Sequence, residues 1–278
     1  MIIGLQLEPE NLSGGVVNPH TGEILAKETL LTEPERGPDA VVANLIRLVQ
    51  IFQDRFSVEK VGISVPGILD AERQKILAIP SIGELKGLEL ANLVSKEVDL
   101  PVNLENKAVC ALLAERWLGA ARKYLNVVVL VLGTDIWGAI LLDGHLYRGK
   151  TGRAGNIGQQ IIDLAIERKN GYGTFVGLAS GRGIQKLTKM SVFELLEKAK
   201  THDLAAQKML EELAEKICVG IYNVWCVLDP EVVILAGEIT NYFGQFRRFF
   251  LDLPVKVIKS ELGEEVFILG AAKATALR

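Results

Sequence analysis

The order of strands and turns occurs twice along the chain, and this repetition constrains the fold more than any other feature. Each half is expected to begin with a strand, a tight turn, a second strand and a hairpin, followed by alternating helices and strands. The opening strands are expected at residues 1–7 and 127–132. We therefore predict an α/β protein built from two duplicated domains.

Hydrophobic spacing predicts most of the remaining elements. Apolar residues recur every three or four positions from Val41 to Phe56, which predicts a helix there. Asp143-Gly144 is a strong hairpin turn. The other expected strands are 15–17, 24–31, 61–65, 101–104, 138–142, 146–147, 232–235 and 255–258, and the other expected helices are 88–98, 108–118, 192–201, 205–228, 242–251 and one beginning at 269.

Charge and apolar content exclude several classes of function. The 278 residues carry a formal net charge of −3, which argues against a general electrostatic attraction to nucleic acid. The arginines and phenylalanines of residues 246–250 are more typical of a helix with one packed face than of a base-stacking surface. The longest clean apolar run, residues 126–132, is too short to span a membrane, and no signal segment is evident. We expect a cytoplasmic protein without nucleic-acid or membrane partners.

Cysteine and histidine are scarce, with 3 residues of each type. The cysteines form no Cys-x-x-Cys pair, and the histidines lie far apart in sequence, so neither a disulfide framework nor a Cys/His zinc site is expected. All three cysteines lie in predicted helices and are interpreted as small core residues. They are Cys110, Cys218 and Cys226.

Several short segments, in order and spacing, resemble the ROK family of sugar kinases and sugar-responsive repressors. They are Val61 to Asp70, Pro101 to Glu115, Gly133 to Gly158, Leu178 to Ile184, Asp229 to Gly237 and Leu269 to Ala274. The resemblance implies a duplicated two-domain actin/hexokinase-like (ribonuclease H-like) fold and a homodimer. It places the N-terminal domain at residues 1–106 plus 263–278 and the C-terminal domain at 107–262. Because the first strand is expected at Met1, we expect no DNA-binding domain ahead of it.

The resemblance places Gln6 and Glu8-Pro9-Glu10 at the family's first phosphate loop, where an aspartate precedes glycines. Those glycines let backbone N–H groups approach the phosphates of ATP. Proline removes one donor and glutamates repel phosphate, so we interpret this segment as an ordinary polar turn.

The resemblance next places Asn106 at a sugar-binding asparagine and Lys107 at the aspartate that acts as the catalytic base. A general base must accept the proton of the attacking hydroxyl. With Glu105 close in sequence, Lys107 is read as a charged, paired lysine; contact with an anion or ligand, and a role as base, stay open as alternatives.

Three further nucleotide positions match the second phosphate loop, namely Gly133, Thr134 and Gly138, and Gly237 matches the adenosine side. Asp135 and Trp137 depart from that loop, because a carboxylate repels phosphate and an indole is bulky. Trp137 either fills the nucleotide cleft or packs between the domains. In the same way, Val266 and Phe267 replace small residues that would pass close to the nucleotide.

The remaining sugar positions implied by the resemblance are Asn156 and Gln159, which join Asn106 and Gly67 as expected sugar-binding residues. Their amides can hydrogen-bond hydroxyls. The zinc ligands of the family fall on Gln159, Glu167, Lys169 and Thr174, and a sugar-binding glutamate falls on Val176. We therefore expect no zinc and no other metal.

Three functions follow from these departures, and we expect the first. It is a catalytically inactive ROK protein that binds a sugar or related small molecule as a sensor or scaffold. The second is an ATP-dependent sugar kinase of the glucokinase or N-acetylhexosamine kinase type, which would use ATP and Mg²⁺ and would need Lys107 neutral or a base such as Glu105 or Asp135. The third is a regulatory subunit that depends on a protein partner.

Overall fold

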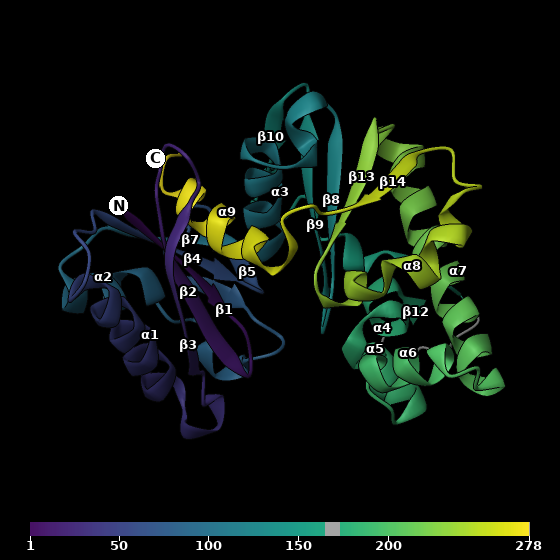
Figure 1. Cartoon of the computed structure of the whole chain (residues 1–278), viewed down its shortest axis with the longest axis horizontal. Helices are drawn as coiled ribbons and strands as arrows, with labels where there is room; N and C mark the ends of the chain where they lie inside the picture. Colours follow the sequence, from purple (N-terminus) through teal and green to yellow (C-terminus); the bar gives the residue numbers. More distant parts are fainter. Residues whose placement is uncertain (165–172, 278) are drawn as a thin grey trace. The chain divides into compact units, whose positions relative to one another are not determined.

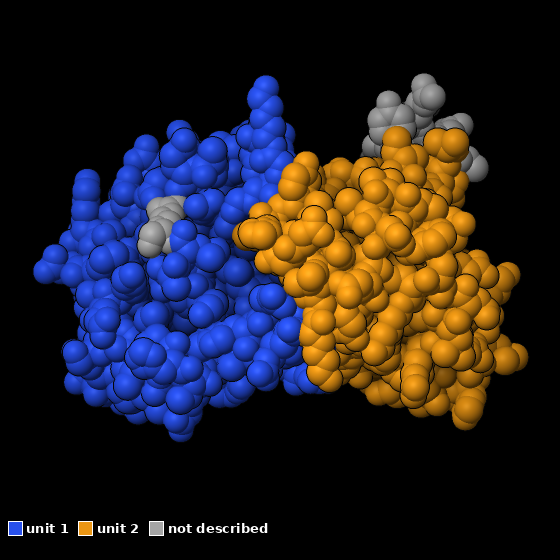
Figure 2. Space-filling model, turned by 90° about the horizontal axis from the view of Figure 1, so that it is seen from above, with its two compact units in different colours: residues 1–122, 148–153, 261–278 blue, residues 123–147, 154–260 orange. Residues whose placement is uncertain are grey.

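The computed structural model describes residues 1–164 and 173–277 and divides into two compact units, coloured separately in Figure 2. Unit 1 comprises Met1–Arg122, Arg148–Arg153 and Glu261–Arg278, and unit 2 comprises Lys123–Tyr147 and Ala154–Ser260. The predicted domain boundaries stay a prediction.

A five-stranded sheet in the order β3-β2-β1-β4-β7 forms the centre of unit 1 (Figure 1). Its strands are β1 (Ile2–Leu7), β2 (Asn11–Val17), β3 (Ile24–Leu31), β4 (Lys60–Val65) and β7 (Val102–Asn106). The first three strands form an antiparallel meander because short turns join them, and β4 and β7 run parallel to β1 after helical crossovers.

Helices cover both faces of this sheet. Ile3, Leu5 and Leu7 of β1 share one apolar core with residues of α1 (Pro38–Gln53) and α2 (Leu90–Val98). Alternate residues of a strand point to opposite faces, so Gly4 lies on the other face, where α9 (Val266–Ala274) packs together with α3 (Lys107–Trp117).

The approach of α9 to this face depends on three glycines. A Cβ atom at Gly4 would overlap the carbonyl oxygen of Ile268, and one at Gly62 would overlap the carbonyl oxygen of Ala271. A Cβ atom at Gly270, within α9, would overlap the carbonyl oxygen of Cys110 on α3. The backbone of α9 therefore lies directly against the backbones of two strands and a helix.

Unit 2 contains a second five-stranded sheet, in the order β10-β9-β8-β13-β14. Its strands are β8 (Val127–Leu132), β9 (Ile136–Leu142), β10 (His145–Tyr147), β13 (Val232–Ala236) and β14 (Lys256–Lys259). As in unit 1, an antiparallel meander is followed by two parallel strands. The predicted duplicated α/β fold is confirmed.

The helices of unit 2 pack an apolar core against one face of its sheet. They are α4 (Phe175–Ala179), α5 (Gly181–Thr188), α6 (Val192–Lys200), α7 (Leu204–Leu228) and α8 (Phe243–Phe246). Within residues 1–164 and 173–277, every helix is too short or too polar to cross a membrane.

Several smaller elements differ from those predicted. The helix expected at 242–251 is instead a broken segment of 3-10 turns, η6 (Glu238–Tyr242) and η7 (Arg247–Phe250), on either side of the short α8. Aromatic residues and Gly244 favour a long helix poorly, and burial of two phenylalanines, Phe246 and Phe250, fixes the irregular path. The last helix begins at Val266 rather than at 269.

The remaining elements are short, and most were not predicted. They are the strand pairs β5 (Ile68–Leu69) with β6 (Ile76–Ala78) and β11 (Ile161–Asp163) with β12 (Gly173–Thr174), and the 3-10 turns η1 (Pro34–Arg36), η2 (Gly83–Leu85), η3 (Ala120–Lys123), η4 (Ile157–Gln159) and η8 (Gly263–Glu265). Two or three residues carry too little periodicity to reveal a strand or turn.

Candidate functional site

Lys107, at the position of the family's catalytic base, is held in an ion pair with Glu8. It is the first residue of α3, directly after β7, and its Nζ lies 2.5 Å from Glu8 Oε1. The side chains of Lys107 and Glu8 are only 6% and 17% exposed. The Lys107 ammonium also lies 4.4 Å from the ring centre of Phe267, and Gln6 Nε2 donates a hydrogen bond to Glu8 Oε1. The lysine is therefore a charged, nearly buried group with a fixed partner.

Glu105, expected beside Lys107, belongs to a different cluster. Arg148 donates two hydrogen bonds to its carboxylate, at 3.1 and 2.5 Å, and Arg73 Nε lies 3.9 Å from it. The expectation that Glu105 is the partner of Lys107 is wrong. The chain turns from strand to helix between these residues, so their side chains meet different surroundings.

Asn106 caps α3 and is tied to the loop at Gly67. Its Oδ1 accepts hydrogen bonds from the N–H groups of Ala108 and Val109, and its Nδ2 donates to the carbonyl oxygen of Gly67 at 2.7 Å. One N–H of the side-chain amide is left to meet a ligand. Unit 1 thus brings together Gly67, Asn106 and Lys107, and adds Glu8 to them.

In unit 2, the loop from Gly133 to Asp135 is bound by the first residues of α5. The N–H groups of Gly181 and Arg182 donate to the carbonyl oxygens of Gly133 and Thr134, at 2.8 and 3.1 Å. The Arg182 guanidinium lies 2.5 Å from Asp135 Oδ1, and the Asp135 side chain is 6% exposed. The loop therefore holds a paired carboxylate in place of the row of backbone donors that surrounds a phosphate.

A second carboxylate lies beside this loop. Among the described residues, the one atom within 4 Å of a Cβ placed at Gly133 is Glu238 Oε2, at 3.9 Å. Glu238 directly follows Gly237, which matches the adenosine side of the family site. Carboxylate groups from two elements of unit 2 thus lie at the loop.

Gly138 and Gly237 have structural reasons to be glycine. The N–H of Gly138 donates to the carbonyl oxygen of Gly155 at 2.8 Å, and a side chain at Gly138 would overlap Ile157. Gly237 has a φ of 93°, and a side chain there would press on the backbone of Leu132. Packing alone accounts for both, and their predicted contact with a nucleotide stays a prediction.

Trp137 lies on β9, opposite Val131 of β8. The residue is 7% exposed, and its indole N–H has no hydrogen-bond partner among the described residues. Both interpretations of Trp137, filling of the nucleotide cleft and packing between domains, stay predictions.

The predicted sugar ligands of unit 2 lie at η4. Asn156 is half-buried immediately before η4, and Gln159 is exposed at its end. Neither side chain hydrogen-bonds to another described residue, so both amides can contact hydroxyl groups. Gly155, with a φ of 90°, lies so close to Gly138 that its backbone fixes this segment to β9.

The segment matched to the family's zinc ligands is described only in part. Glu167 and Lys169 lie outside the described residues, and Thr174 caps α4 by accepting a hydrogen bond from the N–H of Gly177. Over residues 1–164 and 173–277, no three His, Cys, Asp or Glu side chains are grouped so that they could hold a metal ion.

The three cysteines differ in exposure. Cys110 is buried in α3, where burial and the nearby Glu105 carboxylate raise the pKa of its thiol well above the usual value. Cys218 is half-buried, and burial raises its pKa to about 11. Cys226 is exposed. The prediction of a core cysteine is confirmed for Cys110 and wrong for Cys226, because Cys226 lies on the outer face of α7.

The sequence did not predict the contacts of Glu8, Arg182 and Glu238. For Glu8 it predicted only repulsion of phosphate. The signal that could have found the Glu8–Lys107 pair is a charge exchange, in which a cation replaces the family's carboxylate while a new carboxylate appears on the first loop.

Two duplicated sheets, with ligand positions at the ends of their strands, define a protein of the sugar kinase-like class with the actin/hexokinase-like fold. The chain belongs to the ROK family, whose family model matches residues 4–275.

The relatives support this assignment. A β-glucoside kinase of Listeria monocytogenes is 28% identical over 83% of this chain and 80% of its own. A glucokinase of Thermotoga maritima is 26% identical over 98% of this chain and 96% of its own. The structure of a ROK family glucokinase from Streptomyces griseus, in complex with glucose and AMPPNP, superimposes with a TM-score of 0.83 at 24% identity, covering 98% of each chain.

Proposed function

We propose that this ROK protein is catalytically inactive and binds a sugar or a related small molecule, as a sensor or scaffold. The observation that carries the proposal is the ion pair between Lys107 and Glu8, at the position of the family's base. A protonated ammonium has no lone pair with which to accept the proton of a sugar hydroxyl. Loss of a general base typically slows a reaction by about 10²- to 10⁴-fold.

The nucleotide side of unit 2 supports the same proposal. Asp135 and Glu238 bring carboxylates to the loop at Gly133, and the Arg182 guanidinium beside the loop is already paired with Asp135. Carboxylates repel phosphate oxygens, and a cation paired with a carboxylate attracts a polyphosphate less than a free one does. In unit 1, Pro9 removes a backbone donor from the matching first loop.

The sugar side supports retained binding. Asn106 has one amide N–H left after its cap and its bond to Gly67, and the amides of Asn156 and Gln159 are not engaged by described residues. Amides donate and accept hydrogen bonds, which suits the hydroxyl groups of a sugar.

A second candidate is an ATP-dependent sugar kinase, favoured by the relatives, which include β-glucoside kinases, a glucokinase and N-acetyl-D-glucosamine kinases. Such a reaction needs ATP, Mg²⁺ and a base. Arginines pair with Glu105 and Asp135, and the carboxylate in contact with Lys107 within unit 1 is that of Glu8. This candidate therefore predicts that turnover depends on Glu8.

The deciding experiment combines a binding test with a turnover test. The melting temperature of the purified chain is measured with a panel of hexoses, β-glucosides and N-acetylated amino sugars, and with ATP and Mg²⁺. Sugar phosphate formation is then measured with the same panel. We expect a sugar to raise the melting temperature, ATP with Mg²⁺ to leave it unchanged, and no sugar phosphate to form.

Two variants make the outcome specific. Asn156→Ala removes a predicted sugar contact and is expected to abolish the thermal shift caused by the sugar. Sugar phosphate formation that disappears in Glu8→Gln would replace this proposal with the kinase candidate. If no sugar shifts the melting temperature, the sensor proposal is wrong.

A further inference from the structure

Strand β14 is one of the two edge strands of the unit 2 sheet, and among the described residues it pairs with β13 on one side only. The N–H of Ser260, just after β14, donates to the carbonyl oxygen of Leu235 at 2.8 Å. Backbone groups of a strand alternate in direction, so those of Ile258 also point to β13. The N–H and C=O groups of Val257 and Lys259 therefore point away from the sheet.

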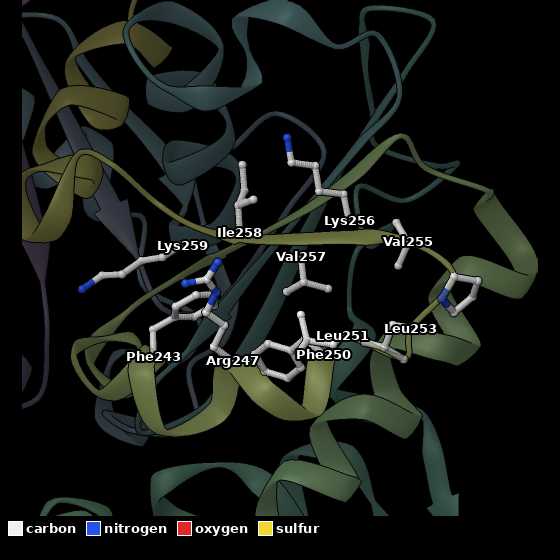
Figure 3. Close-up of a pocket in the computed structure, with 11 residues that line it drawn as sticks. Phe243, Arg247, Phe250, Leu251, Leu253, Val255, Lys256, Val257, Ile258 and Lys259 are labelled. Atoms are coloured by element: carbon white, nitrogen blue, oxygen red, sulfur yellow. The ribbon is translucent and has the colours of Figure 1, made fainter.

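A groove of about 540 Å³ lies along this strand, between β14 and the segment containing α8 and η7 (Figure 3). Its apolar lining includes Phe243, Phe250, Leu253, Val255 and Val257. Leu251, which also lines the groove, is 73% exposed. An extended chain placed against β14 would bury apolar side chains here.

The charged residues that line the groove are all cations, namely Arg247, Lys256 and Lys259. Of these, Lys256 contacts the hydroxyl of Tyr124, and neither Arg247 nor Lys259 forms an ion pair with another described residue. The chain as a whole carries a formal net charge of −3, so these three cations are opposite in sign to the net charge of the chain. It complements an acidic ligand.

Lysines on edge strands also prevent copies of a protein from pairing with one another. A second copy of β14 aligned with the first would bring Lys256 and Lys259 close to lysines of the same kind, which disfavours that occupant. An acidic chain gains from the same charges that repel a second copy.

We propose that β14 is a docking site for an acidic peptide segment, which binds in extended conformation as an additional strand. The backbone groups of Val257 and Lys259 supply the hydrogen bonds, and the apolar lining takes side chains on the groove face of the added strand. Successive side chains of a strand point to opposite faces, so Lys259 and Arg247 attract carboxylates on the groove face and Lys256 attracts those on the other face. The site lies entirely in unit 2 and does not depend on the proposed sugar binding.

The probe is a fluorescein-labelled, acetylated octapeptide with the repeat Val-Val-Glu-Glu, which presents both valine and glutamate on each face of an extended strand. Its binding to the full chain is measured by fluorescence anisotropy. We expect binding that weakens as salt is added. The counterpart with lysine in place of glutamate is expected to bind at least about tenfold more weakly. The acidic peptide N-methylated at alternate amides, which cannot form the ladder, is expected not to bind.

Variants of the chain test each part of the surface. Val257→Pro removes an outward N–H and leaves the bonds to β13 in place, so it is expected to abolish binding. Lys259→Glu is expected to weaken binding about fivefold. Lys208→Glu makes the same charge change on an exposed lysine of α7 outside the groove and is expected to have no effect. If Val257→Pro fails to fold, Lys259→Glu and the N-methylated peptide still decide the question.

Four results would overturn the proposal. They are no anisotropy change up to millimolar chain, equal binding of the acidic and basic peptides, full binding of the N-methylated peptide, and binding unaffected by Lys259→Glu. If sedimentation shows a dimer that Val257→Pro dissociates, a second copy of the chain occupies the edge of β14. That result would also refute the proposal.

Discussion

At the scale of single residues, substitution of either Lys107 or Glu8 alone is expected to destabilise the chain. Both side chains are mostly buried, and removal of one member of such a pair leaves an uncompensated charge. The cost measured for buried pairs is about 3–5 kcal/mol. The pair thus fixes the chemistry of the base position and contributes to the stability of unit 1.

We predict that Lys107→Asp yields no kinase activity and destabilises the chain, because the new carboxylate would face Glu8. The double variant Lys107→Asp with Glu8→Lys restores an ion pair and is expected to recover most of the lost stability. Urea unfolding measures both effects, and sugar phosphate formation measures activity. Turnover in the single variant would contradict the predicted lack of activity. A double variant no more stable than Lys107→Asp would contradict the stabilising role of the ion pair.

The cysteines provide a second prediction, through the dependence of thiol reactivity on the thiolate. At pH 8, we expect the exposed Cys226 to react rapidly with an aromatic disulfide reagent and the other two thiols to react slowly. Cys218 has a pKa of about 11, so its thiolate fraction and its rate should rise about tenfold per pH unit below that value. Cys226→Ser should remove the rapid phase. Two rapid thiols at pH 8 would contradict the burial of Cys110 and Cys218.

The sequence predicted residue types better than residue partners. The position of Lys107 after β7 and the retention of Asn106 were visible in the motif. The cap made by Asn106 and the Glu8–Lys107 pair were not, because they depend on which strand ends the fold brings together. A charge partner distant in sequence leaves no local periodic signal.

At the scale of elements, the contact of α9 with the sheet of unit 1 depends on the absence of side chains. We predict that Gly62→Ala destabilises the chain by about 2–4 kcal/mol, since the added methyl group would meet the backbone of α9 and not a movable side chain. Urea unfolding gives the value. Gly83→Ala is the matched control, because a Cβ there meets no atom within 4 Å, and it should change stability by less than about 0.5 kcal/mol.

Long, periodic elements were predictable and short ones were not. β3 and β8 were expected at the residues where they occur, since continuous or alternating apolar patterns define them. The broken segment from η6 to η7 reads as a helix, because its phenylalanines recur at near-helical spacing. Tertiary burial of those rings overrides the local preference for a regular helix.

At the scale of the whole molecule, the ROK family implies a homodimer, and α7 presents a surface that suits one. Val219, Tyr222 and Val227 of α7 are 41%, 47% and 80% exposed. Exposed apolar residues gathered on one helix are typical of an interface between chains.

We predict that light scattering gives twice the 30.4 kDa mass of one chain, and that Val219→Glu combined with Tyr222→Lys gives a monomer. Lys208→Glu, elsewhere on α7, should leave the mass unchanged. A measured mass equal to that of one chain, even at high protein concentration, would refute the homodimer. A double variant that still has the mass of a dimer would refute the role of α7.

The position of α9 near the end of the chain also determines when unit 1 can complete its folding during synthesis. β1 and β4 leave the ribosome early, yet the helix that covers Gly4 and Gly62 is made only after residue 265, when all of unit 2 has already been synthesised. While the chain grows, this face of the first sheet therefore lacks the part of its cover that α9 provides, although α3 has already been made. Unit 1, although it begins the chain, is the last to be completed, and a nascent chain stalled before α9 would present that face to chaperones.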